Sequence, residues 1–218
     1  MVEKILNNRF IILYLTPFVI GSLSILSFQP YNLVIINFII FPIFFYLLVY
    51  INKKSKAIYR KKPYKQNFFI FGLLFGLGFY ISGISWITNS LTFDENFKIF
   101  IPFALILIPL FLSLFVSIIT FFIGQYLKLN FTSFLIFCSS IDFSDYLRAK
   151  ILTGFPWNLW AYSTYSFNEI LQILNLVGLH SYNLFVVTIY TFPVIFFFKI
   201  SKLKKLASLG VISCVILS

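Results

Sequence analysis

The residues best suited to chemistry lie in the segment from Asp145 to Trp160, within an otherwise apolar sequence. Asp145 and Arg148 stand three residues apart, a spacing that places a carboxylate and a guanidinium on the same face of a helix. The motif Thr-Gly-Phe-Pro-Trp (153–157) follows, and its proline cannot continue that helix. Because charge is costly at a membrane boundary, we expect this pair to have a specific role.

Three roles for the pair are open. In the favoured one, Asp145 and Arg148 form a structural brace for the aromatic turn that follows them. In the second, Arg148 binds a phospholipid phosphate through charge-assisted hydrogen bonds. In the third, the pair is a generic interfacial one with an extended arginine. Phe155, Pro156 and Trp157 are candidates for a rim at which acyl chains enter, or for plain interfacial anchors.

The sequence predicts no catalytic residue, no metal site and no cofactor. Cys138 and Cys214 lie in apolar runs without a CxxC partner or a nearby basic residue, so we interpret both as buried small hydrophobes. The single His180 stands at the expected start of a helix, and no metal-ligand spacing surrounds it.

The composition is that of a membrane protein. Hydrophobic residues make up 60% of the 218 positions and charged residues only 11%, and the mean hydropathy is +0.96. Soluble domains carry roughly a quarter charged residues. The net charge of +11 comes from Lys and Arg in short loops between apolar runs, which is typical of topology signals rather than of nucleic-acid binding.

The apolar runs predict an all-α polytopic membrane protein with about six transmembrane helices and the start of a seventh. One transmembrane domain covers residues 1–218, and its helices are expected near 10–28, 33–51, 68–89, 97–125, 131–147, 177–198 and, incomplete, 206–218. The last run is too short to cross a bilayer of about 30 Å, which favours a truncated or incomplete product.

The basic loops set the expected orientation. Basic residues near the N-terminus and in loops 52–66, 126–130 and 199–205 place these parts in the cytoplasm. Asp94 and Glu95 then fall on the periplasmic side. The segment 149–176 is also expected there, as an irregular interfacial stretch rich in Trp and Tyr.

Three motifs stand in order along the chain. The first is the turn Phe28-Gln-Pro-Tyr31, the second is Gly76-Leu-Gly-Phe-Tyr-Ile-Ser-Gly-Ile-Ser-Trp86, and the third runs from Asp145 through Tyr162-Ser163. Together they resemble the bacterial apolipoprotein N-acyltransferases. In that family the third motif reads Trp-x-x-x-Glu-x-x-Arg, then Thr-Gly-Phe-Pro-Trp and Gly-Tyr-Ser. Here Ile141, Asp145 and Ala161 replace the Trp, the Glu and the Gly.

The resemblance implies an acyltransferase of the bacterial inner membrane. Members move an acyl chain from a membrane phospholipid to the N-terminal diacylglyceryl-cysteine of a lipoprotein, using Glu, Lys and Cys of a nitrilase-like domain. The resemblance covers only the membrane half, and no such domain precedes Ser218. The chain is therefore expected to be a truncated or split membrane domain that is inactive alone and meets the lipoprotein only when joined to the missing domain.

Two alternatives remain open. The size, basic charge and helix count also suit the substrate-binding membrane subunit of an uptake transporter, although the first helix lacks the alanines that such subunits use to dock a partner. A degenerate, non-functional remnant is the other, favoured by Ile141, Ala161 and the abrupt end.

Overall fold

A computed structural model describes residues 8–58, 65–151, 156–167 and 171–198 of the chain, and these ranges contain helices and no strand. The expected incomplete helix at 206–218, the basic loop 199–205, Phe155 and Cys214 lie outside the described residues. In chain order the elements are η1 (Ile11–Leu15), α2 (Thr16–Ser24), η2 (Ile25–Ser27), η3 (Val34–Ile36), α3 (Asn37–Ile58), α4 (Lys65–Ile84), η4 (Ser85–Thr92), η5 (Glu95–Phe100), α5 (Ile101–Ile123), α6 (Phe131–Lys150), η6 (Trp160–Thr164), α8 (Ile173–Val177), α9 (Leu179–Thr191) and η7 (Phe192–Phe197).

Four helical stretches of the described chain are long and apolar enough to cross a membrane. They are Val34–Ser55, Lys65–Thr92, Glu95–Ile123 and Leu179–Phe197, and Ile11–Ser27 is a shorter apolar helix. The expectation of a helical membrane protein is thereby confirmed, whereas the number of spans and the side of the N-terminus stay predictions. α6 is not among the four: it has 20 residues but carries Asp142, Asp145, Arg148 and Lys150 near its end, and charge is costly in hydrocarbon.

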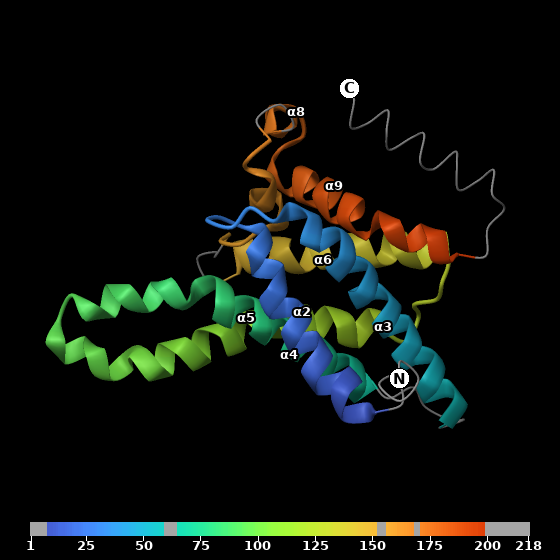
Figure 1. Cartoon of the computed structure of the whole chain (residues 1–218), viewed down its shortest axis with the longest axis horizontal. Coiled ribbons are helices and arrows are strands. Elements are labelled where there is room, and N and C mark those ends of the chain that lie inside the picture. The colour runs from blue at the N-terminus through green and yellow to red at the C-terminus, as the bar shows by residue number, and fades with distance from the viewer. Residues whose placement is uncertain (1–7, 59–64, 152–155, 168–170, 199–218) are drawn as a thin grey trace.

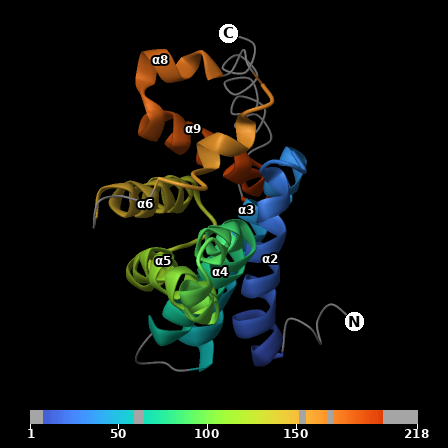
Figure 2. The same ribbon diagram turned by 90° about the vertical axis from the view of Figure 1, so that its left-hand side faces the viewer.

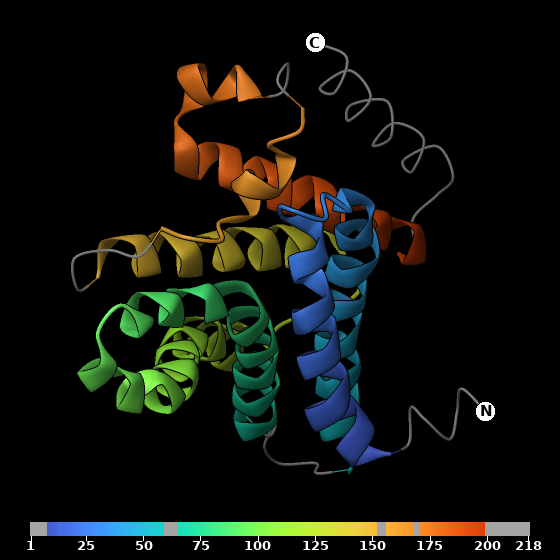
Figure 3. The ribbon, with the colours of Figure 1, turned by 60° about the vertical axis from the view of Figure 1, so that its left-hand side comes forward.

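The helices run in two main directions: α2 and α3 lie along one, and α6 and α9 cross it (Figure 1 and Figure 3). In Figure 1 the described end of α3 and the end of η7 lie on the right, and the hairpin of α4, η4, η5 and α5 projects furthest to the left. Figure 3 shows α2 and α3 side by side, with α6 and α9 crossing them. Turned as in Figure 2, α4 and α5 stack beside α2.

Small residues let α4 approach its neighbours. A Cβ at Gly76 would overlap Ser113 of α5, and one at Gly72 would overlap Thr120. The Thr120 hydroxyl also donates a hydrogen bond of 2.9 Å to the carbonyl of Phe68 on α4. Close backbone approach and interhelical hydrogen bonds are what hold helices together in lipid, where no hydrophobic effect drives their association.

Aromatic rings fill the centre of the bundle. The rings of Phe44 and Phe75 stack with centroids 4.2 Å apart. Trp160, the first residue of η6, enters the same layer. The centroid of its ring lies 4.6 Å from that of Phe79 and 4.7 Å from that of Phe41, which it meets edge to face. Such pairs add to the free energy of burial, so Trp160 ties the segment after α6 to α3 and α4.

The α4–α5 hairpin carries its charged residues at the tip. α4 ends at Ile84, where the backbone leaves α-helical geometry (φ −124°, ψ 8°) and continues as the 3-10 helix η4. At the tip the Asp94 carboxylate caps η5 by accepting from the Asn96 N–H at 2.9 Å, and Lys98 pairs with Glu95. Apolar side chains remain exposed nearly to the tip, where Phe93 is 91% exposed.

Candidate functional site

The last turns of α6 hold a buried ion pair. Arg148 donates from Nη2 to the Asp145 carboxylate at 3.0 Å, and only 1% of the arginine is exposed. From Nη1 it donates to the carbonyl of Trp157 at 2.6 Å. Its guanidinium also lies over the ring of Tyr80 on α4, 5.4 Å from the centroid. The i, i+3 spacing predicted from the sequence thus forms the pair, which faces the interior of the bundle.

Asn183 of α9 joins this pair to the following segment. Its side-chain NH2 donates to Asp142 at 2.8 Å and to Asp145 at 3.1 Å. Its side-chain oxygen accepts the backbone N–H of Ala161 at 2.9 Å. Asn183 is fully buried, and these bonds satisfy both ends of its amide. One amide of α9 therefore links α6 to Ala161 in η6.

Two tyrosines of α9 hold the rest of η6. The Ser163 and Tyr190 hydroxyls lie 2.6 Å apart, and the Thr164 and Tyr182 hydroxyls 2.7 Å apart. All four residues are buried, and buried hydroxyls that pair with each other rigidify the segment that carries them. We call residues 157–164, together with their partners on α6 and α9, the collar.

The predicted rim residues take different places in the collar. Trp157 is 52% exposed, and its ring meets that of Trp86 on η4 edge to face, with centroids 5.4 Å apart. Pro156 is exposed, and Phe155 lies outside the described residues. Arg148 contacts the backbone of Trp157 from inside. Because its side chain is enclosed, binding a lipid phosphate would require this arrangement to open.

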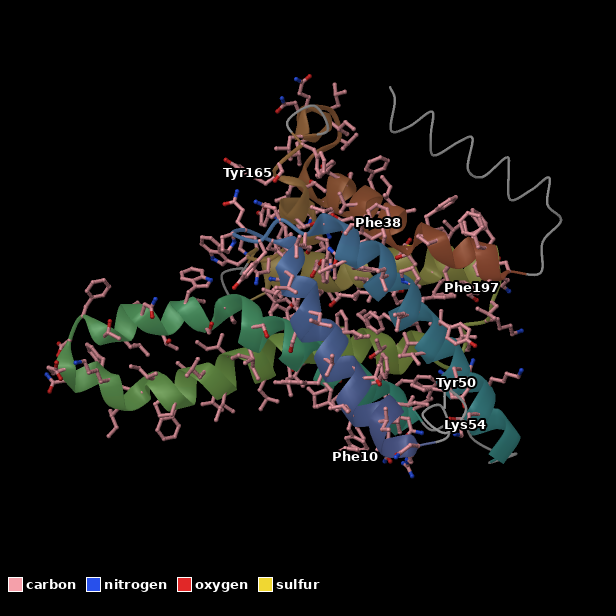
Figure 4. The ribbon with its side chains drawn as sticks, viewed as in Figure 1. Phe10, Phe38, Tyr50, Lys54, Tyr165 and Phe197 are labelled. Carbon is pink, nitrogen blue, oxygen red and sulfur yellow. The ribbon has the colours of Figure 1, made fainter. Side chains whose placement is uncertain are left out.

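Sequence reasoning missed Asn183, Tyr182, Tyr190 and Tyr80. For Asn183 the sequence held one weak indication: an asparagine in the middle of an apolar helix needs hydrogen-bond partners in lipid. The tyrosines carried no such signal, since an aromatic residue in a membrane helix is usually packing. Figure 4 shows side chains crowded between α6, α9 and α3, where the ring of Phe38 meets that of Tyr190, whereas Tyr165 lies at the surface.

The described residues supply no evident nucleophile or metal site. Cys138 is 1% exposed within α6. No group of three or more His, Cys, Asp or Glu side chains in the described ranges is placed to hold a metal ion. His180 instead packs edge to face on Tyr146, with centroids 5.0 Å apart. What the described collar can do chemically is position an exposed aromatic rim on a rigid base.

A sequence model of the apolipoprotein N-acyltransferase N-terminal domain matches residues 20–192. The chain belongs to this family. All three motifs on which the resemblance rests fall within the matched range. Two of the family departures are buried here: Ile141 packs in the core, and Ala161 contributes its backbone N–H to Asn183. The collar is thus a structural feature of an apolipoprotein N-acyltransferase N-terminal domain.

Individual apolipoprotein N-acyltransferases are similar to the chain over most of its length. That of Rickettsia typhi is 36% identical over 194 residues, which are 87% of this chain and 36% of the relative. That of Rickettsia prowazekii is 36% identical over 169 residues, 76% of this chain and 34% of the relative. That of Bradyrhizobium diazoefficiens is 32% identical over 175 residues, which are 79% of this chain and 31% of the relative. The chain spans about a third of the length of these relatives.

Proposed function

We propose that this chain acts as the membrane domain of an apolipoprotein N-acyltransferase in the bacterial inner membrane. It would cross that membrane several times and present the collar at the periplasmic face. The observation that carries the proposal is the family match over residues 20–192, which includes the whole collar. The collar supports it physically, because exposed Trp157 is held on a base of buried hydrogen bonds.

The reaction that this family membership suggests is acyl transfer. A thiolate of a nitrilase-like domain attacks an acyl ester of a phospholipid, so that the acyl group becomes a thioester and a lysophospholipid leaves. The lipoprotein's N-terminal amine then attacks that thioester, which forms an amide and releases the thiolate. In this scheme the present chain supplies no nucleophile. Its part is to hold the rim of Trp157 and Trp86 at the membrane surface, where both rings contact acyl chains and orient them.

Asp145 and Arg148 act as the brace in this proposal. Removing the brace would release the Trp157 carbonyl and loosen the rim without touching a reacting atom. Family membership favours this role over that of an uptake-transporter subunit. A degenerate remnant would differ from a working membrane domain in that it would not support lipoprotein acylation.

The test is complementation in a bacterium whose own N-acyltransferase can be depleted. The chain is expressed with the nitrilase-like part of the Rickettsia typhi relative, and the acylation of a lipoprotein N-terminus is read by mass spectrometry. The two halves of that relative, expressed separately, form the positive control. We expect the third acyl chain to return with the pair and to be reduced by Trp157→Ala. No third acyl chain, when the control pair works, would contradict the proposal and support a remnant.

A further inference from the structure

A small cavity lies behind the brace, in the middle of the aromatic layer. Its volume, counted as space open to the centre of a water molecule, is about 10 Å³. Aromatic residues of α3 and α4, among them Phe44 and Phe75, make up half of the residues in its wall. One water molecule needs roughly 10–15 Å³ by this measure, so the cavity is the size of a single water.

The wall is not purely apolar. Ser144, Asp145, Tyr80 and Trp160 line the same cavity, and each carries a group that can hydrogen-bond. A water molecule needs two to four such partners to remain bound inside a protein. An entirely apolar cavity of this size stays dry, but this one offers a hydroxyl and a carboxylate contributed by neighbouring residues of α6.

Ser144 is the observation that points to a ligand. It is 2% exposed, and its Oγ has no hydrogen-bond partner among the residues that the structure describes. Other buried serines on these helices do find partners: the Ser117 hydroxyl donates to the Phe69 carbonyl at 2.8 Å, and the Ser133 hydroxyl accepts from the Lys128 backbone N–H at 2.9 Å. A buried hydroxyl with no partner is unfavourable.

We propose that one water molecule occupies this cavity and hydrogen-bonds to the Ser144 hydroxyl and the Asp145 carboxylate. Asp145 already accepts from Arg148 and Asn183, and a carboxylate has about four acceptor positions, so it can accept from water as well. The water would place a mobile dipole beside the ion pair and lessen the cost of burying it. The ion pair of the collar is therefore hydrated from inside the bundle.

The sign of one stability change tests the proposal. Ser144→Ala in the full chain removes a hydroxyl that is either bound to water or unsatisfied. Ser139→Ala, at an exposed position of the same helix, serves as control for the gain in helix propensity that both changes share. With water bound, the thermal midpoint of Ser144→Ala in detergent micelles falls about 2–4 °C below that of the control. A midpoint equal to or above the control overturns the proposal.

A second measurement does not depend on the variant folding. An experimental density map of the unmodified chain, at a resolution that shows ordered water, should contain a peak at hydrogen-bond distance from Ser144 Oγ. A map that resolves waters elsewhere in the bundle and leaves this cavity featureless overturns the proposal. Both outcomes are independent of acyltransferase activity.

Discussion

The buried pair of Asp145 and Arg148 should show strong energetic coupling. The perturbation is a double-mutant cycle of Asp145→Ala, Arg148→Met and the two together. Each single change leaves one charge buried in the core without the partner that balances it, since the side chains are 6% and 0% exposed. Breaking a buried pair in this way costs about 3–5 kcal/mol of unfolding free energy.

The double variant should cost much less than the sum of the singles. It buries no charge, and it loses chiefly the bonds to the Trp157 carbonyl and to one N–H of Asn183. At about 1–3 kcal/mol for each group left unsatisfied, the double change costs about 2–6 kcal/mol. The singles sum to about 6–10 kcal/mol, so the coupling energy is about 4 kcal/mol.

The hairpin tip offers a matched control. Glu95 and Lys98 form an ion pair at the same i, i+3 spacing, but their side chains are 84% and 45% exposed. An exposed pair contributes about 1 kcal/mol or less. Both cycles are measured by denaturant unfolding in detergent micelles, followed by far-UV circular dichroism. Equal coupling in the two pairs would refute the argument that burial makes Asp145 and Arg148 a brace.

Three further predictions concern topology and packing. In a cysteine-free background, Tyr162→Cys should react with a membrane-impermeant maleimide in intact spheroplasts, and Lys128→Cys only after permeabilisation; the reverse pattern would contradict the orientation. Gly76→Leu should lower the unfolding free energy by about 1–3 kcal/mol because its side chain would meet Ser113, whereas Ile118→Val on the exposed face of α5 should change it by less than about 0.5 kcal/mol. Asn52→Leu should cost about 2–4 kcal/mol in the same assay, because the buried amide donates to the carbonyls of residues 125 and 127; an unchanged midpoint would show that this link between α3 and the connection from α5 to α6 does not stabilise the fold.

The sequence was informative where the physics is local. Apolar runs of about 20 residues predicted helices because lipid forces each backbone segment to satisfy its own hydrogen bonds. The spacing of Asp145 and Arg148 predicted their pairing because helical geometry alone brings positions three apart together. The ordered motifs predicted the family, which the match over residues 20–192 confirmed.

The residues at which helices end were harder to predict from the sequence. The helix expected at 68–89 is α-helical only from Lys65 to Ile84 and then becomes the 3-10 helix η4. Gly83 precedes that change, and polar residues stand at 85, 88, 89, 90 and 92 after it. Such a stretch suits either kind of helix, so the sequence alone did not predict the change. The charged end of α6 is enclosed by other elements, and that environment comes from packing rather than from its own composition.

What the sequence by itself determined was the membrane character, the family and the existence of the ion pair. Only the tertiary structure decided which way the pair faces and what it holds. Asn183 and Tyr80 reach it from α9 and α4, far away in the chain. Trp157 and Trp160 show the limit most plainly: they are the same residue type three positions apart, yet one is 52% exposed and the other 3%. The exposure of the two rings differs because the collar packs on α9 and directs the ring of Trp160 into the aromatic core. That packing depends on contacts between segments far apart in the chain, which local sequence does not encode.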